Sequence, residues 1–276
     1  MNVIGFQLDI AWENKTENYS RVSRWFRQSH PAPGTLVVLP EMFATGFSMQ
    51  AMQTQESQPS PTIRFLSDLA RQYQIAIVAG LVLTDAAGRP RNESVFISPS
   101  GEVGCRYAKI QTFTLAGETQ HYTPGDAVQV FTYGGFKIAP FVCYDLRFPE
   151  LFRLAVDQGA EVLTVIANWP VVRVGHWRTL LQARAIENQA YVVGINRTGK
   201  DPTLSYNGQS LIIDPLGEIL ADGGEQEGVV KASLDREIVK SWRARFPALA
   251  DRRNPRNPQP GHPPVAGSPS AATHRD

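Results

Sequence analysis

The sequence predicts an α/β protein in which helices pack against mixed β-sheets. Two observations support this class. Along residues 1–250, short apolar or alternating runs typical of strands are interspersed with segments whose apolar residues recur at helical spacing. Some strand-like runs follow one another directly, as in hairpins, whereas others are separated by a helix-like segment. Because a purely parallel sheet contains no hairpins, we expect both parallel and antiparallel strand pairs.

The strands are assigned from runs that are apolar or that alternate between apolar and polar residues. In chain order they are expected over 2–10, 35–40, 75–83, 93–110, 136–144, 161–168, 191–196, 209–220 and 228–234. The segment 93–110 is expected to form two strands with a turn at Ser100 and Gly101. The runs 35–40 and 161–168 are almost wholly apolar, as in strands that are buried on both faces.

Four helices are expected between these strands, over 18–29, 59–74, 149–159 and 176–189. In the second of them, Ser60 is a suitable N-cap and Pro61 occupies the favourable first helical position. The third begins near Pro149, also suited to a first turn, and is closed by Gly159. Strands and helices therefore alternate in the manner of layered α/β proteins.

Composition excludes several classes of protein. The net charge is +1, from 27 basic and 26 acidic side chains, so neither nucleic acid nor an anionic membrane is expected as a partner. No apolar run is long enough to span a membrane, and the first residues do not resemble a signal peptide. The two cysteines, Cys105 and Cys143, are too few for a disulfide framework, which favours a cytoplasmic location.

The composition changes near Asp251. The segment 251–276 contains six prolines in 26 residues and almost no apolar side chains. Such a segment cannot bury enough surface to offset the entropy lost on ordering. We therefore expect one domain over 1–250 and a disordered Pro-rich tail over 251–276. A proline-rich ligand for a partner protein is the alternative, although no repeated PxxP pattern with basic flanks is present.

Three reactive side chains each lie at the end of an expected strand. Glu41 follows the run 35–40, Lys109 ends the hairpin, and Cys143 ends the strand before the helix at Pro149. Active sites of α/β proteins assemble at the carboxyl ends of strands. A cysteine at a strand-to-helix turn can project from the sheet while nearby backbone N–H groups face an oxyanion.

Each of these residues also has an ordinary alternative. Cys143 could be a structural thiol, and Glu41 or Lys109 a solvated charge at a strand end. If the site is functional, a nearby lysine and helix N-terminus are expected to lower the pKa of the Cys143 thiol. Cys105 is expected to be structural, and His176 is expected to cap or pack at the start of its helix.

The motifs around these residues resemble a known family. LPEMF, YAKI and CYDLRFPELFR resemble the carbon-nitrogen hydrolase (nitrilase) superfamily. ATGFSM, the segment 167–201 and GQSLIIDPLGE resemble its bacterial ω-amidase branch, and the resemblance covers about residues 1–250. It implies an α-β-β-α sandwich with four layers per monomer, commonly in a homodimer. One departure is Gln111, where many members of the family have histidine.

The resemblance also implies a catalytic set and a reaction. It assigns the nucleophile to Cys143, the general base to Glu41, the oxyanion-binding lysine to Lys109 and a supporting glutamate to Glu118. The backbone N–H of Tyr144 would assist at the oxyanion. The implied reaction is hydrolysis of the terminal amide of 2-oxoglutaramate, a small-molecule substrate, through a thioester, with no metal and no organic cofactor. A nitrile or carbamoyl hydrolase and a non-catalytic binding protein of the same fold are the alternatives.

Candidate substrate-binding residues follow the strand 161–168. Asn168 and Trp169 leave the sheet on the same side as Cys143, where an indole ring could form a wall for a short acyl chain. Arg173 lies four residues further on, and a guanidinium is suited to binding a carboxylate through two hydrogen bonds. An ordinary surface arginine is the alternative at this position.

Overall fold

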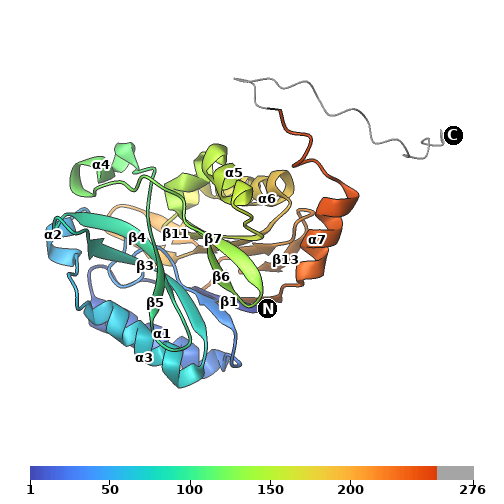
Figure 1. Ribbon diagram of the computed structural model, residues 1–276. Helices are drawn as coiled ribbons and strands as arrows, with labels where there is room; N and C mark the ends of the chain where they lie inside the picture. Colours follow the sequence, from blue (N-terminus) through green and yellow to red (C-terminus); the bar gives the residue numbers. More distant parts are fainter. Residues whose placement is uncertain (254–276) are drawn as a thin grey trace, which may run out of the picture.

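The computed structural model of the chain describes residues 1–253, in which two six-stranded sheets pack face to face (Figure 1). The first sheet has the order β14 (Gly228–Ser233), β1 (Asn2–Gln7), β2 (Leu36–Val38), β3 (Ala76–Thr84), β4 (Pro90–Ile97) and β5 (Val103–Ala108). The second has the order β13 (Ile219–Asp222), β12 (Leu211–Ile213), β9 (Tyr191–Asn196), β8 (Val162–Ala167), β7 (Phe136–Val142) and β6 (Phe131–Tyr133). A separate hairpin pairs β10 (Thr198–Lys200) with β11 (Ser205–Asn207).

Both large sheets are mixed, as the sequence predicts. In the first sheet, β1, β2 and β3 are parallel, whereas β14, β4 and β5 join by antiparallel pairing. In the second, β7, β8 and β9 are parallel, and β6, β12 and β13 are added as antiparallel strands. Parallel strands need covering helices on their outer faces, which the intervening helical segments provide.

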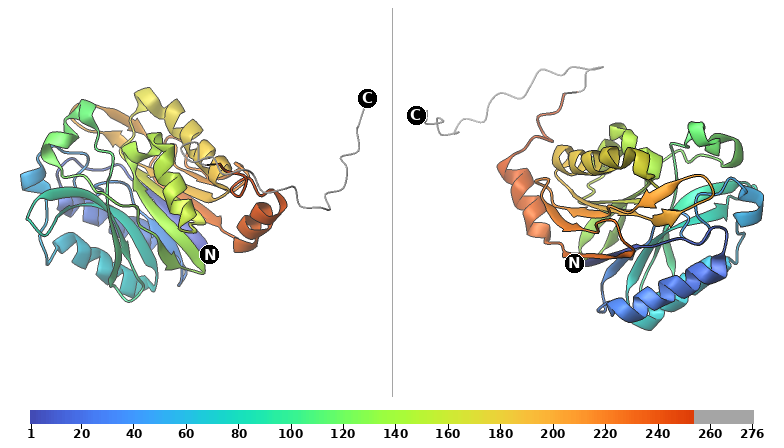
Figure 2. Two further views of the ribbon diagram at one scale, coloured as in Figure 1. Left: turned by 45° about the horizontal axis from the view of Figure 1, so that its top comes forward. Right: turned by 180° about the vertical axis from the view of Figure 1, so that it is seen from behind.

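Helices cover the outer face of each sheet (Figure 1). α1 (Lys15–Ser29) and α3 (Pro61–Tyr73) lie against the first sheet, and α5 (Pro149–Asp157) and α6 (Val174–Asn188) lie against the second. The expected α-β-β-α sandwich, with four layers in one monomer, is therefore confirmed. Figure 2 shows that α7 (Arg236–Arg245) lies at the end of the molecule away from the short helices α2 (Ala51–Thr54) and α4 (Glu118–His121). Three short 3₁₀-helices are also present: η1 (Thr114–Ala116), η2 (Cys143–Arg147) and η3 (Val171–Arg173).

Alternate residues of the first sheet face different layers. In β2, Leu36 and Val38 pack between the two sheets, whereas Val37 packs under the helices. This is the two-residue period of a strand that is buried on both faces. Where β1 crosses the second sheet, Gly5 leaves room for the Ile195 side chain: a Cβ on Gly5 would lie 2.0 Å from that side chain. A residue with a side chain at position 5 would therefore collide with the facing sheet.

The helix boundaries agree well with the sequence, and the strand boundaries agree less well. Ser60 caps α3 by accepting a hydrogen bond from the Ile63 N–H at 3.1 Å, and Pro61 is its first residue. The segment 209–220, expected as one strand, is instead the hairpin β12–β13, because Gly217 adopts φ +94° in the turn. α7 was not predicted, since half of its residues are charged and Val239 is its one fully buried side chain.

Two further expectations concern the limits of the domain. Residues 254–276, which make up most of the expected Pro-rich tail, lie outside the described residues. Among the described residues the helices and strands end with α7, and residues 248–251 form turns after it. Among residues 1–253, no helix has the length and apolar character that crossing a membrane requires.

Candidate active site

The strand directions bring four side chains to one edge of the paired sheets. Glu41 lies three residues after β2, Lys109 follows β5, Cys143 follows β7 and Asn168 follows β8. β5 runs in the same direction as β2, because two antiparallel pairings separate it from β3. The carboxyl ends of these strands therefore meet, which is where α/β proteins commonly build their sites. The three reactive residues expected from the sequence are neighbours in space.

Glu41 is fully buried and held by three side chains. Its Oε1 accepts hydrogen bonds from Asn92 Nδ2 at 2.7 Å and from Lys109 Nζ at 3.0 Å. Its Oε2 accepts from the Asn168 backbone N–H at 2.8 Å, and its backbone carbonyl accepts from Asn168 Nδ2 at 2.7 Å. The chain at Glu41 passes so close to β3 that a Cβ on Gly80 would lie 2.4 Å from the Glu41 Cα. A carboxylate held in this way has one fixed orientation.

Lys109 is buried between two carboxylates. Its Nζ donates to Glu118 Oε2 at 2.8 Å and to Glu118 Oε1 at 3.0 Å, in addition to its bond with Glu41. Burial alone would lower the pKa of Lys109, but the two carboxylates outweigh burial and raise the pKa well above its usual range. Asn92 Nδ2 also donates to Glu118 at 2.9 Å and so bridges the two glutamates. The group carries one positive and two negative charges.

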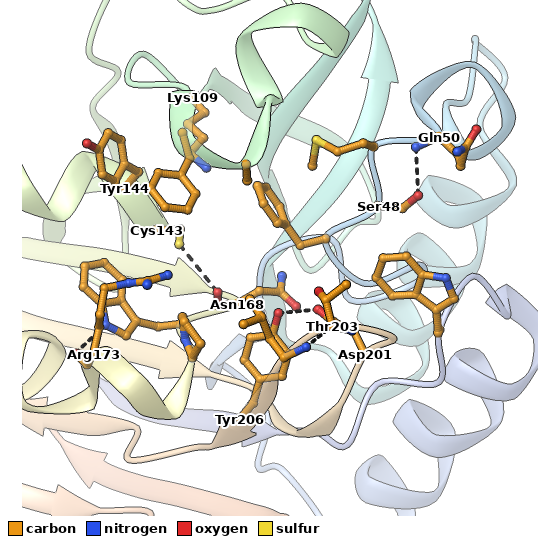
Figure 3. A pocket seen from close by; sticks show the side chains of 18 of the residues that line it. Ser48, Gln50, Lys109, Cys143, Tyr144, Asn168, Arg173, Asp201, Thr203 and Tyr206 are labelled. Carbon is orange, nitrogen blue, oxygen red and sulfur yellow. Dashed lines mark hydrogen bonds between the residues drawn. The ribbon is translucent and has the colours of Figure 1, made fainter.

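Cys143 occupies a strained turn at the start of η2. Its φ is +47°, a left-handed conformation that a residue with a side chain rarely adopts. The side chain is half-buried, and the Sγ lies 3.9 Å from the backbone carbonyl of Asn168 (Figure 3). Backbone strain of this kind persists where the surrounding structure holds it, often at functional sites. The turn points the sulfur into a pocket, in the manner of the nucleophile elbow of other α/β enzymes.

The charge balance contradicts one expectation about this thiol. The sequence suggests that Lys109 and a helix N-terminus lower the pKa of Cys143. Instead, burial and the Glu41 carboxylate raise the pKa well above its usual range, and Lys109 offsets only part of this effect. The prediction was wrong because Lys109 is already paired with two carboxylates, so the site as a whole is anionic. Cys143 therefore rests as a thiol and needs a base to accept its proton.

A pocket of about 530 Å³ opens above Cys143. Figure 3 shows Tyr144 and Arg173 on one side of Cys143, and Ser48 and Gln50 on the other. The lining residues come from six segments of the chain: Trp12, Glu13, Phe47, Ser48, Met49, Gln50, Lys109, Phe113, Ala116, Cys143, Tyr144, Arg147, Asn168, Trp169, Pro170, Arg173, Asp201, Thr203, Leu204 and Tyr206. A cavity of this size, mostly apolar with a few convergent polar groups, is suited to a small organic molecule.

Two arginines lie on the wall of the pocket next to Cys143. The guanidinium carbon of Arg147 is 4.8 Å from the ring centre of Trp169, and that of Arg173 is 5.5 Å from the ring centre of Phe113. Within residues 1–253, neither arginine forms a salt bridge with a carboxylate. Guanidinium groups that stack on aromatic rings keep their edges free for hydrogen bonds. This wall is suited to an anionic group.

The remaining residues singled out in the sequence have distinct positions. Tyr144 is the second residue of η2, where a backbone N–H has no acceptor within the helix. Trp169 is buried, and its indole N–H donates to the Arg173 carbonyl at 2.8 Å, which ties these two residues together. Cys105 packs half-buried against the core, and burial raises its pKa to about 11. His176 lies exposed in the first turn of α6, with its Nδ1 3.3 Å from an Arg147 nitrogen.

Comparison with known proteins agrees with this geometry. The family model described as "Carbon-nitrogen hydrolase" matches residues 5–244. The chain belongs to this family. Similar relatives include the 2-oxoglutaramate amidase of Bacillus subtilis (strain 168), 34% identical over 248 residues that cover 90% of this chain and 95% of the relative. The Omega-amidase YafV of Yersinia enterocolitica is 40% identical over 221 residues, covering 78% of this chain and 83% of the relative.

A solved structure extends the comparison to three dimensions. A CN-hydrolase superfamily protein from Xanthomonas campestris, with an arsenic adduct in its active site, is 32% identical to this carbon-nitrogen hydrolase. The TM-score is 0.86, and the alignment covers 92% of this chain and 97% of that one. The nitrilase resemblance of the sequence is therefore confirmed for both the family and the fold.

Sequence reasoning missed several residues of this carbon-nitrogen hydrolase site. Asn92 lies inside the hairpin strand β4, where an asparagine gives no sign of a catalytic contact. Arg147 stands within CYDLRFPELFR, four residues after Cys143, but nothing in the local pattern indicates that it faces the pocket. Asp145, two residues after Cys143, is fully buried and was also not recognised. For Arg147 and Asp145, the one available signal in the sequence was that a charged side chain stands in the turn directly after the nucleophile.

Proposed function

We propose that this protein is an ω-amidase that hydrolyses the terminal amide of 2-oxoglutaramate, and of related dicarboxylate monoamides, to the acid and ammonia. One observation carries the proposal: a cysteine on a strained turn shares a pocket with Lys109, which is paired with the buried Glu41 and Glu118, and with two arginines that form no salt bridge within residues 1–253. The relatives named as 2-oxoglutaramate amidase and ω-amidase support the choice of substrate class. A simple aliphatic nitrile or uncharged amide lacks the carboxylate that this wall would bind.

The first half-reaction transfers the acyl group to the enzyme. Glu41 accepts the proton of the Cys143 thiol, and the sulfur forms a bond to the amide carbon. The carbonyl electrons move to oxygen, where the Lys109 ammonium and the Tyr144 N–H stabilise the negative charge. Glu41 then donates its proton to the amide nitrogen, the carbon–nitrogen bond breaks, and ammonia leaves. The product of this step is a thioester on Cys143.

The second half-reaction releases the acid. Glu41 is again a carboxylate and accepts a proton from water, whose oxygen attacks the thioester carbon. The carbon–sulfur bond breaks as the oxyanion collapses, and the thiolate recovers a proton from Glu41. One base therefore serves in both directions, which requires that its carboxylate stay in place through the cycle. The bonds from Asn92 and Asn168 to Glu41 support this requirement.

Glu118 has a supporting role in this proposal. It accepts two hydrogen bonds from Lys109 and one from the Phe113 backbone N–H at 2.6 Å, so it anchors the lysine rather than touching the thiol. Asn168 acts mainly on Glu41, through its backbone N–H and its amide. Trp169 and Arg173 line the pocket beside Cys143 and would contact the acyl chain and the carboxylate of the substrate.

The test of this function is a substrate panel. Purified protein is given 2-oxoglutaramate, succinamate, an uncharged aliphatic amide, an aliphatic nitrile and a carbamoyl compound, and released ammonia is measured. We expect 2-oxoglutaramate to have the highest kcat/KM, with succinamate slower because it lacks the keto oxygen. A preference for uncharged amides or nitriles would overturn the assignment. No ammonia from any compound would favour a non-catalytic binding protein.

Arg173 is proposed to bind the substrate carboxylate. Arg173→Ala should weaken transition-state binding of carboxylate-bearing amides by about 1.5–3 kcal/mol, as expected for a hydrogen bond to a charged group. An uncharged amide makes no such bond and should be hydrolysed nearly as before. The measurement is kcat/KM for both classes. Arg173→Lys is the matched control, which keeps the charge but loses the two-pronged geometry and should recover part of the loss. An equal loss for both classes would rule out this role.

The assembly state and the location of the protein are also part of the proposal. We propose a homodimer in the cytoplasm. Leu154 of α5, Ile186 of α6 and Leu216, whose neighbour Gly217 packs against Ile186, are about half exposed, and exposed apolar side chains of this kind often mark a contact surface. Light scattering of the purified protein would contradict the dimer if it gave the mass of a single chain.

A further inference from the structure

Asp145 is a buried carboxylate that the proposed chemistry does not use. It lies in η2, two residues after Cys143, and is fully buried. Among residues 1–253 it forms no salt bridge, and the groups that donate hydrogen bonds to it are all neutral. Burying a carboxylate without a paired cation is costly. Such a cost calls for a physical reason in the surrounding contacts.

Three donors converge on this carboxylate from two separate segments. Oδ1 accepts from the Gln111 backbone N–H at 2.9 Å, and Oδ2 accepts from the Tyr107 hydroxyl at 2.8 Å. Oδ2 also accepts from the Val142 backbone N–H at 2.9 Å. Tyr107 and Gln111 flank Lys109, two positions away on each side, and Val142 directly precedes Cys143. The carboxylate therefore joins the residues around the lysine to the residues around the nucleophile.

The two segments belong to different sheets. Tyr107 is in β5 of the first sheet, whereas Val142 ends β7 of the second. The position of Lys109 relative to Cys143 thus depends on how the two sheets are joined at this edge. An ionised carboxylate can accept three hydrogen bonds on its two oxygens, whereas an asparagine offers one acceptor oxygen and would turn an NH₂ group toward a donor. This difference explains why a charge is kept here.

We infer that Asp145 is a positioning residue that fixes the separation between the Lys109 ammonium and the Cys143 sulfur. The inference rests on the proposed thioester mechanism, in which both groups act on one carbonyl. It also bears on Gln111, the position at which the sequence departs from the nitrilase resemblance. The contact from position 111 to Asp145 uses the backbone N–H, which glutamine and histidine supply equally.

The decisive variant is Asp145→Asn, which preserves shape and removes one acceptor. With the amide that the wild type hydrolyses best, kcat should fall about 100-fold, the scale for a catalytic group displaced by roughly 1 Å. KM should change by less than about threefold, since Asp145 does not face the pocket. Alkylation of Cys143 by iodoacetamide forms no oxyanion and depends on Lys109 only through the thiol pKa, so its rate should change far less than kcat.

Two further variants make the result unambiguous. Tyr107→Phe removes one donor while leaving the carboxylate, and should lower kcat about tenfold without loss of folding. Gln111→His keeps the backbone donor and should leave kcat within about twofold. Circular dichroism and thermal melting measure the folded fraction of each variant.

The outcomes separate this inference from the proposed function. Wild-type kcat in Asp145→Asn would overturn the inference alone. So would a loss of kcat that only matches the loss of folded protein, or an equal loss in Gln111→His. A wild type that releases no ammonia from any amide would overturn the mechanism together with the inference. A selective loss of kcat in Asp145→Asn and Tyr107→Phe, with alkylation preserved, would establish it.

Discussion

Replacing Cys143 with alanine should abolish ammonia release from 2-oxoglutaramate. In the proposed mechanism the sulfur forms the only covalent bond between enzyme and substrate, and no other thiol faces the pocket among the described residues. The variant should keep its fold, because the side chain is half-buried and borders an open cavity, so little core packing is lost. An ammonia-release assay and a thermal melt of the same preparation measure the two effects.

Cys105→Ala is the matched control for this prediction. Cys105 is also free and half-buried, but it lies on β5 and does not line the pocket. This variant should keep full activity. In the wild type, iodoacetamide should label Cys143 faster than Cys105, because Cys143 opens into the pocket and Cys105 does not. Activity in Cys143→Ala, or equal labelling of both thiols, would refute the assignment of the nucleophile.

The layers of the fold were predictable because their signals are local. Apolar runs that end at Glu41 and Cys143 identify buried strands, and Ser60 with Pro61 marks a helix start by capping chemistry alone. The elements that were missed lack such signals. α7 buries little, and the short strands β10 and β11 form a small two-stranded sheet of their own, so neither depends on a strong apolar pattern.

The residues of the candidate site also fall into those that the sequence predicts and those that it does not. Glu41, Lys109 and Cys143 could be found because each reactive side chain follows a recognisable strand. Asn92 and Asp145 could not, since their importance depends on contacts with residues 26 to 51 positions away in the chain. Pairing of this kind is a property of the assembled sheets, and no local pattern in the sequence encodes it.

The direction of the Cys143 pKa shift is the clearest example of a property that depends on contacts between distant residues. A lysine beside a cysteine suggests a stabilised thiolate, and that inference holds when the lysine is otherwise unpaired. Here Glu41 and Glu118 both bind Lys109, so the nearest charges to the thiol sum to a negative value. Two carboxylates and burial then outweigh one ammonium, and the pKa rises.

Replacing Glu41 with glutamine should separate catalysis from thiol reactivity. Without the base, neither the thiol nor the hydrolytic water loses its proton to the enzyme, so kcat should fall about 10²–10⁴-fold. The same change removes a carboxylate that raises the pKa of Cys143, so that pKa should fall. The midpoint of iodoacetamide alkylation against pH should therefore move to lower pH, while hydrolysis collapses.

Glu118→Gln is the comparison that tests this reasoning. It removes the same charge from the same group, but Glu118 affects the thiol less than either Glu41 or Lys109 does. The alkylation midpoint should therefore shift in the same direction by a smaller amount, with Lys109 released from its anchor. An unchanged or higher midpoint in Glu41→Gln would show that the Glu41 carboxylate does not control the thiol proton. In that case Glu41 could not be the base that activates Cys143.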